Sequence, residues 1–269
     1  MPVYFFALSQ INEINILHAL LIFVILHLFL YPASNAYNSY MDKDKGSIGS
    51  VEKPMTPTKQ LFYTSIFLDV IAVISGLFVS YYFTLALLLY ISASRAYSYR
   101  GIRLKKYPFI GFILAIVFQG GVVYFMVSHG SNVLKPLNIS FLAMLSSTLM
   151  VGSFYPLTQI YQHRQDKEDG VKTISMLLGY RGTFVFSAIF YFSSMLFMGY
   201  YFAANLELER FLALIICMLP SLLFFLWWLF AVRKNKAAAN FKNAMKMNWI
   251  AAFCSNAGFL VLLIMKEKF

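Results

Sequence analysis

Long apolar stretches separated by short polar loops run along almost the whole chain. Crossing the hydrocarbon core of a bilayer takes roughly 20 mostly apolar residues as a helix, and an open sheet edge cannot lie in lipid. We therefore predict an all-α membrane protein with about eight spans. The third span is short, and the turn before it is expected near Tyr81–Thr84. The expected spans cover residues 12–34, 61–81, 82–97, 109–127, 138–157, 182–203, 211–232 and 247–265.

The composition agrees with this pattern. The 269 residues are 60% hydrophobic and only 12% charged, with a mean hydropathy of +0.68, whereas soluble domains are about 45–50% apolar and about 25% charged. Cys217 and Cys254 both lie inside spans, so we expect neither a disulfide framework nor a cysteine metal site.

The amino-terminal segment "MPVYFFALSQINE" has no basic region, and its apolar part is only Pro2–Leu8. We expect no cleavable signal peptide here, and the stretch is too short to cross the membrane. It is predicted to be either a stub at the membrane interface or the end of a helix that begins outside this chain.

The formal net charge is +11, yet the basic residues follow the loops rather than forming a nucleic-acid surface. With the predicted spans, the four basic loops lie on the same side, which the positive-inside rule makes cytoplasmic. We therefore expect no nucleic-acid partner, and an integral protein of a bacterial-type inner membrane. The loops hold Lys43, Lys45, Lys53 and Lys59; Arg95, Arg100, Arg103, Lys105 and Lys106; Arg164, Lys167, Lys172 and Arg181; and Arg233, Lys234, Lys236, Lys242 and Lys246.

An internal repeat ends the first and fifth spans. Residues 31–46 read "YPASNAYNSYMDKDKG" and residues 155–170 read "YPLTQIYQHRQDKEDG", a gapless match to Y-P-x-[S/T]-[N/Q]-x-Y-[N/Q]-x-x-x-D-K-x-x-G. Because the copies are four crossings apart, they emerge on the same face, as in parallel repeats of transporters. We predict one integral-membrane domain, residues 1–269, made of two four-helix units at about 12–107 and 138–246.

Each copy places two amides and an aspartate at positions i, i+3 and i+7, which share one face of a helix. Pro32 and Pro156 would kink these helices near the interface. We expect the two polar faces to converge on one cavity. The residues concerned are Asn35, Asn38 and Asp42 in the first copy and Gln159, Gln162 and Asp166 in the second.

Two aspartates with flanking amide oxygens suit Mg²⁺, which binds through one or two carboxylates and completes its shell with water and phosphate oxygens. Neighbouring lysines and arginines would then bind a diphosphate. The simpler interpretation, that each aspartate is a solvated residue at a helix end, remains open. The additional acids Asp44, Glu168 and Asp169 lie one helical step further on; they either assist the site or, more simply, are solvated partners of the adjacent lysines. We predict Asn38, Asp42, Gln162 and Asp166 as metal ligands, with Asp42 and Asp166 catalytic.

The whole chain resembles the UbiA superfamily of intramembrane prenyltransferases, whose members carry two aspartate-rich motifs related to N-D-x-x-D-x-x-x-D. Further similarities follow each motif: Lys53-Pro54 after the first, and Gly170, Lys172 and Thr173, a G-x-[K/R]-T pattern running on to Gly179, after the second. Tyr97-Ser98 with its basic loop resembles the family's Y-S…K/R segment. The resemblance implies substrate-binding roles for Asn35, Asn38, Gln159, Gln162, Lys53, Arg103, Lys105, Lys106 and Lys172.

The resemblance further implies a helical ring around a cavity that opens to lipid. In it a Mg²⁺-bound prenyl diphosphate ionises and alkylates a lipophilic, often aromatic, acceptor. This chain keeps only Asp42 and Asp166 where the family usually has about three acids per motif. Since amides bring no negative charge, the metal should bind more weakly without substrate. A terpene cyclase, or a lipid-binding or transport protein without catalysis on the same fold, therefore stay open as alternatives.

Three other polar features carry weaker expectations. His163 contacts substrate or merely faces water. Asp69, deep in the second span, should face the bundle interior. Gln119-Gly120-Gly121 should allow either a ligand or, as the simpler use, a second helix to approach closely.

Overall fold

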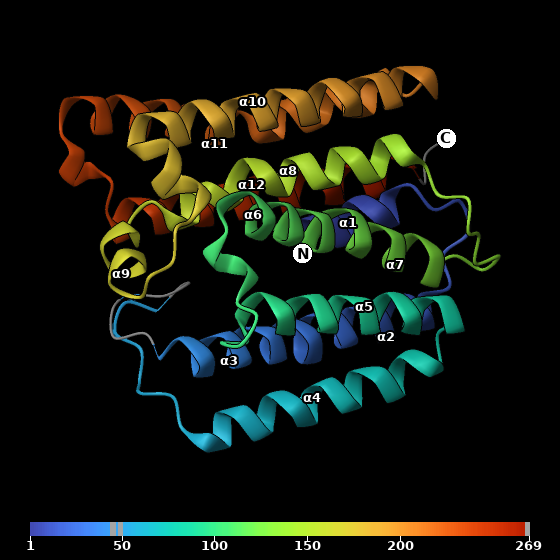
Figure 1. Cartoon of the computed structure of the whole chain (residues 1–269). Helices are drawn as coiled ribbons and strands as arrows, with labels where there is room; N and C mark the ends of the chain where they lie inside the picture. The colour runs from blue at the N-terminus through green and yellow to red at the C-terminus, as the bar shows by residue number, and fades with distance from the viewer. Residues whose placement is uncertain (44–46, 48–50, 267–269) are drawn as a thin grey trace.

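The computed structural model describes residues 1–43, 47 and 51–266, and this part of the chain is almost entirely helical (Figure 1). Outside the helices, an isolated antiparallel bridge joins Ile14 and Asn132. The α-helices are α1 (Pro2–Ser9), α2 (Ile16–Val24), α3 (Tyr31–Asp42), α4 (Lys59–Leu77), α5 (Tyr81–Ser98), α6 (Pro108–Ile116), α7 (Val123–Gly130), α8 (Phe141–Gln159), α9 (His163–Glu168), α10 (Ile174–Ala204), α11 (Leu208–Lys234) and α12 (Phe241–Lys266).

Shorter helical turns join several of these elements. The π-helical turn η1 (Ile25–Leu30) makes α2 and α3 continuous, and η3 (Val117–Val122) does the same for α6 and α7. The 3-10 turns η2 (Leu104–Lys106) and η4 (Lys236–Ala238) lie in the basic loops before α6 and α12.

Within the described residues, seven helical segments are long and apolar enough to cross a membrane. They are Ile16–Asp42, Lys59–Leu77, Pro108–Gly130, Phe141–Gln159, Ile174–Ala204, Leu208–Lys234 and Phe241–Lys266. The expected span 82–97 forms helix α5, which lies alongside α3 and α4 (Figure 1) but is not among the seven. Its last two turns carry Ser94, Arg95, Tyr97 and Ser98, and these polar side chains lower its hydropathy. The turn before α5 occupies residues 78–80, slightly earlier than expected.

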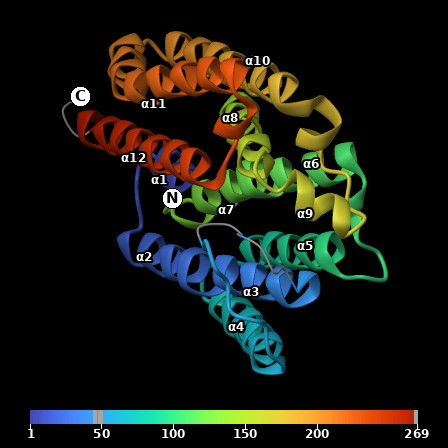
Figure 2. The same ribbon diagram turned by 90° about the vertical axis from the view of Figure 1, so that its left-hand side faces the viewer.

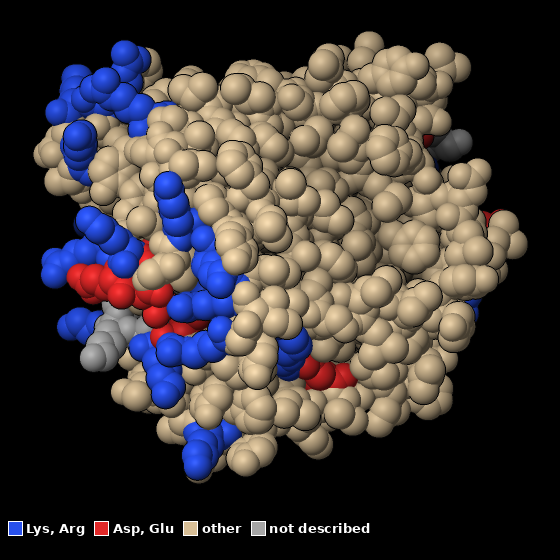
Figure 3. Space-filling view, viewed as in Figure 1, with Lys and Arg blue, Asp and Glu red and all other residues tan. Residues whose placement is uncertain are grey.

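The helices form two outer groups with a layer between them. Figure 2, viewed along the bundle, shows α2–α5 on one side, α10–α12 on the other, and α6–α8 between. The Lys and Arg side chains gather at one end of the molecule, where α3 and α11 end, and the remaining visible surface is mostly uncharged (Figure 3). The basic loops therefore share one end of the bundle, as the spans predicted.

Helix α1 is packed inside the bundle. Phe6 is fully buried, stacks on Phe259 with 4.9 Å between ring centroids, and contacts Tyr124 at 5.2 Å. The predicted amino-terminal stub is thus a short helix of the bundle, and its aromatic side chains fill the core between α7 and α12.

Arg210 holds the C-terminal end of α1, which lies at the other end of the bundle from the basic loops. Its Nη2 donates to the carbonyl oxygens of Ser9 at 2.8 Å and Leu262 at 3.2 Å, and its Nη1 lies 2.5 Å from Glu207 Oε2. Ser9 is the last residue of α1, and its carbonyl has no partner within that helix, so the buried arginine satisfies it and also ties α1 to α12.

Gly120 and Gly121 let η3 pack directly on α8. A Cβ atom at Gly120 would lie only 2.5 Å from the Cα atom of Thr148, and one at Gly121 would lie 2.9 Å from its Oγ1. The predicted close approach of a second helix is confirmed. Gln119, next to this contact, lines the cavity described below.

Candidate active site

The first copy of the repeat lies on one helix. Asn35, Asn38 and Asp42 belong to α3 and line a single cavity of about 260 Å³. Asp42 is the last helical residue, because Lys43 adopts a left-handed conformation with φ of 53° and ends the helix. The turn that precedes Pro32 is the π-helical η1, where the missing proline N–H disturbs the regular hydrogen-bond ladder.

The second copy is built differently. Helix α8 passes through Pro156 and ends at Gln159, and α9 begins only at His163. The Gln162 N–H donates to the Gln159 carbonyl at 3.0 Å, and the Asp166 N–H donates to the Gln162 carbonyl at 2.9 Å. The expectation of one continuous helix face is therefore wrong for this copy, because a tight turn separates Gln159 from Gln162 and Asp166, which belong to the beginning and the body of α9. The three side chains nevertheless line the same cavity as the first copy.

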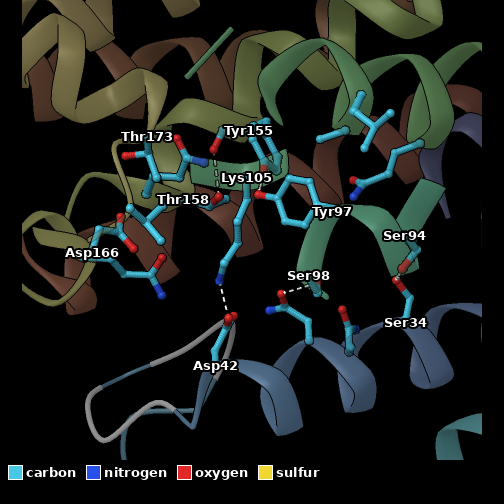
Figure 4. A pocket seen from close by; sticks show the side chains of 18 of the residues that line it. Ser34, Asp42, Ser94, Tyr97, Ser98, Lys105, Tyr155, Thr158, Asp166 and Thr173 are labelled. Atoms are coloured by element: carbon cyan, nitrogen blue, oxygen red, sulfur yellow. Dashed lines mark hydrogen bonds and ion pairs between the residues drawn. The ribbon is translucent and has the colours of Figure 1, made fainter. Parts of the chain in front are cut away.

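The two copies meet across the cavity, with Asp42 on α3 and Asp166 on α9 (Figure 4). The Lys105 ammonium reaches into the space and forms an ion pair with Asp42, whose side chain is only 3% exposed. Arg103 lies 3.8 Å from Asp42 Oδ1 and forms a second ion pair with Asp169. Two cations from the loop before α6 therefore face three carboxylates contributed by the two copies.

Three predicted substrate-binding lysines are not part of the cavity lining. Lys53, Lys106 and Lys172 are exposed on the basic end of the molecule, and the Lys106 ammonium lies 4.9 Å from the ring centroid of Tyr107. The structure thus brings together all six motif residues, Lys105 and, beside them, Arg103, but leaves these lysines at the periphery. Asp44, considered as an additional acid, lies outside the described residues.

Besides the six amides and aspartates of the two motifs, several hydroxyl-bearing residues line the cavity. Tyr97 on α5 and Tyr155 on α8 are joined through their hydroxyl groups, and the Oγ atoms of Ser34 and Ser94 are 2.5 Å apart. Tyr155 and Ser34 are positions of the repeat, so the repeat alone could have indicated that they line the cavity. Asp169 had been judged a solvated partner of a lysine. Its role in lining the cavity depends on α9 ending beside the η2 loop, which no local pattern shows.

The amide groups differ in what they offer to a ligand. The Ser98 hydroxyl donates to Asn38 Oδ1 at 2.7 Å, and the Gln162 amide nitrogen donates to the Ser47 carbonyl at 3.2 Å. Gln159 Oε1 is buried and has no hydrogen-bond partner among the described residues, a costly state for a polar atom. It is available to accept from a ligand or to bind a cation.

The side-chain oxygen atoms of the cavity suit a hard cation that binds together with an anionic substrate. Among the described residues, no three His, Cys, Asp or Glu side chains are grouped closely enough to hold a metal ion by themselves. Mg²⁺ characteristically uses one or two protein carboxylates together with substrate phosphate oxygens. Asp42, Asp166 and the unpartnered Gln159 oxygen fit that requirement.

His163 and Asp69 make contacts that stabilise the fold. The His163 ring stacks on Tyr180 at 4.9 Å, and its Nε2 is 2.7 Å from Ser175 Oγ. Burial lowers the pKa of His163, which favours the neutral ring. Asp69 faces the bundle interior as expected and pairs with Arg95, whose guanidinium lies 3.9 Å from the ring centroid of Tyr37.

The fold and cavity define a polytopic membrane protein with a charged site at one end of its helical bundle. Residues 1–252 match the UbiA prenyltransferase family, and the chain therefore belongs to that family. No curated protein matches the chain.

Solved structures of UbiA homologues share the fold. One from Aeropyrum pernix K1, in its apo form, has a TM-score of 0.72 and 18% identity, covering 97% of this chain and 95% of its own. A homologue from Archaeoglobus fulgidus bound to DMAPP and Mg²⁺ has a TM-score of 0.66 and 15% identity, covering 97% and 93%. The same organism's homologue bound to GPP and Mg²⁺ has a TM-score of 0.63 and 14% identity, covering 97% and 95%.

Proposed function

We propose that this protein transfers an isoprenyl group from a prenyl diphosphate to a lipophilic acceptor within the membrane, in a Mg²⁺-dependent reaction. The observation that carries the proposal is the meeting of both polar motifs with Lys105 and Arg103 at one cavity. The family match and the DMAPP and GPP bound to similar folds support the substrate class.

Asp42 and Asp166 would hold the metal with the amide groups of Asn38 and Gln162, and Asn35 and Gln159 would contact the diphosphate. When bound, Mg²⁺ supplies positive charge that stabilises the leaving diphosphate. Asn38 would bind through the lone pair of its oxygen that Ser98 leaves free.

The protein's own cations act on the same leaving group. Lys105 is held by Asp42 at the cavity and would exchange that contact for diphosphate oxygens when substrate enters. Arg103, held by Asp169, would bind the diphosphate through its planar guanidinium. The exposed Lys53, Lys106 and Lys172 would raise the local concentration of the anionic substrate.

Four aromatic side chains are part of the cavity lining. Tyr90, Tyr97, Phe118 and Tyr155 line it, and the faces of such rings attract cations. When the carbon–oxygen bond to the diphosphate breaks, the bonding pair leaves with the diphosphate. These rings would then stabilise the allylic cation until the acceptor forms its new bond and loses a proton.

The proposal is tested by supplying the purified protein with labelled prenyl diphosphates of several chain lengths, Mg²⁺ and a membrane lipid extract. Prenyl transfer predicts a labelled, enlarged lipophilic product that depends on the extract. A cyclase would give a labelled hydrocarbon without the extract. A lipid-binding or transport protein would leave the label in the diphosphate.

We further propose that the cavity opens toward the cytoplasm, because Lys and Arg gather at that end of the bundle (Figure 3). In a variant with Lys53→Cys and both native cysteines replaced, a membrane-impermeant maleimide should label inverted vesicles and spare intact cells. Labelling of intact cells would reverse the orientation.

A further inference from the structure

A second hollow lies at the basic end of the molecule, apart from the active site. It is bounded by the beginning of α10 on one side and by the end of α11 with η4 on the other. Four exposed cations line it, and no acidic side chain does among the residues that the structure describes; the four are Arg181, Arg233, Lys234 and Lys236. We call it the α10–α11 groove.

A break in α10 forms the first wall of this groove. Gly179 has φ of 67° and ψ of 176°, outside the helical region. The break is fixed from both sides: Thr183 Oγ1 donates to the Gly179 carbonyl at 2.8 Å and lies 3.0 Å from Ser175 Oγ. The stacking of His163 on Tyr180 holds the restart of the helix in place.

The opposite wall is equally well anchored. Trp228 on α11 is fully buried, packs edge-on against Phe184 at 5.0 Å, and donates from its Nε1 to the Ala238 carbonyl at 2.8 Å. Asn243 on α12 donates to the same carbonyl at 3.0 Å. The groove is therefore present before any ligand arrives, which lowers the entropic cost of binding.

The positive charges of the groove favour binding of an anion. In the part of the chain that the structure describes, none of its four cations forms an ion pair with an acidic side chain. The positive-inside rule explains why basic residues occur at this end. It does not require four of them to surround one hollow between two helices.

Apolar side chains continue from both walls toward the membrane. Val185 and Ile189 follow Arg181 at successive four-residue steps, and Phe230 and Leu226 precede Lys234 at the same spacing, so each set shares a helix face with its cation. All four apolar side chains are exposed. A cationic pocket above two apolar stripes matches a molecule with an anionic head and hydrocarbon chains.

We propose that the α10–α11 groove binds the phosphate headgroup of an anionic phospholipid, with its acyl chains along α10 and α11. Basic pockets between transmembrane helices commonly bind such headgroups. This site is independent of prenyl transfer, since none of its cations lines the active-site cavity.

The test is lipid retention by the purified full-length protein, measured by native mass spectrometry after exchange into detergent containing phosphatidylglycerol and phosphatidylcholine. The wild type should retain phosphatidylglycerol preferentially. Lys234→Gln/Lys236→Gln should weaken this retention on the order of 10-fold, since a basic residue near an anionic lipid contributes about a fivefold effect. Arg181→Gln, on the opposite wall, should act in the same direction.

Lys242→Gln/Lys246→Gln is the matched control, because both lysines are exposed at the same end but do not line the groove. It should leave retention unchanged. Equal retention of the two lipids, or equal losses in both double variants, would overturn the proposal. Inorganic phosphate is the second probe. If it binds the wild type but not Lys234→Gln/Lys236→Gln while phosphatidylglycerol does not bind, the groove binds free phosphate and the lipid assignment is wrong.

Discussion

Asp42 and Lys105 form an ion pair at the centre of the cavity, although 62 positions separate them in the chain. Asp42 ends the helix that carries the first motif, and Lys105 belongs to the short turn η2 before α6. Both side chains are largely buried. The pair therefore places a cation where the diphosphate of the proposed substrate would lie and keeps it oriented before substrate arrives.

Lys105→Met should weaken binding of a prenyl diphosphate on the order of 10- to 100-fold, because it removes a charge-assisted contact of about 1.5–3 kcal/mol. Titration of the purified protein with a non-hydrolysable prenyl diphosphate analogue measures this. Lys106→Met provides the control, because Lys106 is exposed beside Tyr107. Unchanged binding in Lys105→Met, or an equal loss in Lys106→Met, would exclude the assigned role.

Arg95→Met should destabilise the protein, because it leaves the Asp69 carboxylate largely buried without its partner. Loss of one member of a buried pair costs about 3–5 kcal/mol, and the partial exposure of this pair reduces the expected loss to about 1–3 kcal/mol. Thermal unfolding in detergent gives the measurement. The double variant Arg95→Met/Asp69→Leu should recover much of the stability, whereas simple additivity of the two single effects would contradict the coupling.

Gly120→Ala should lower stability by about 1–3 kcal/mol, the usual cost of overpacking. The reason is that its Cβ would lie 2.5 Å from the backbone of Thr148, which cannot rotate away. Gly182→Ala is the comparison, because its Cβ would meet only the Leu178 side chain, at 3.1 Å. The same unfolding assay should show a clear loss for the first variant and little change for the second. Equal melting temperatures of the two variants would contradict the tight contact, because α8 and η3 would then move apart at little cost.

Much of the fold follows from the sequence, because hydrophobic run length and loop charge are local properties. The repeat also indicated which residues would line the cavity. The break between Gln159 and His163 was not predictable, since the i, i+3, i+7 spacing alone fits a continuous helix. The sequence also could not show that Asp169 lies at the cavity or that Lys53 and Lys172 lie at its periphery, because these positions depend on how distant loops pack against each other. The division into two four-helix units stays a prediction.

The most direct test of the proposed chemistry is Mg²⁺-dependent release of diphosphate from a prenyl diphosphate by the wild type, Asp42→Asn and Asp166→Asn. Glu168→Gln serves as the control, because Glu168 is exposed and pairs with Arg164 outside the cavity. We predict release by the wild type and the control, and losses on the order of 100-fold in both aspartate variants, comparable to removing one preorganised electrostatic contact. Release that persists without Mg²⁺ or in both aspartate variants, or no release by the wild type with any chain length, would contradict the account.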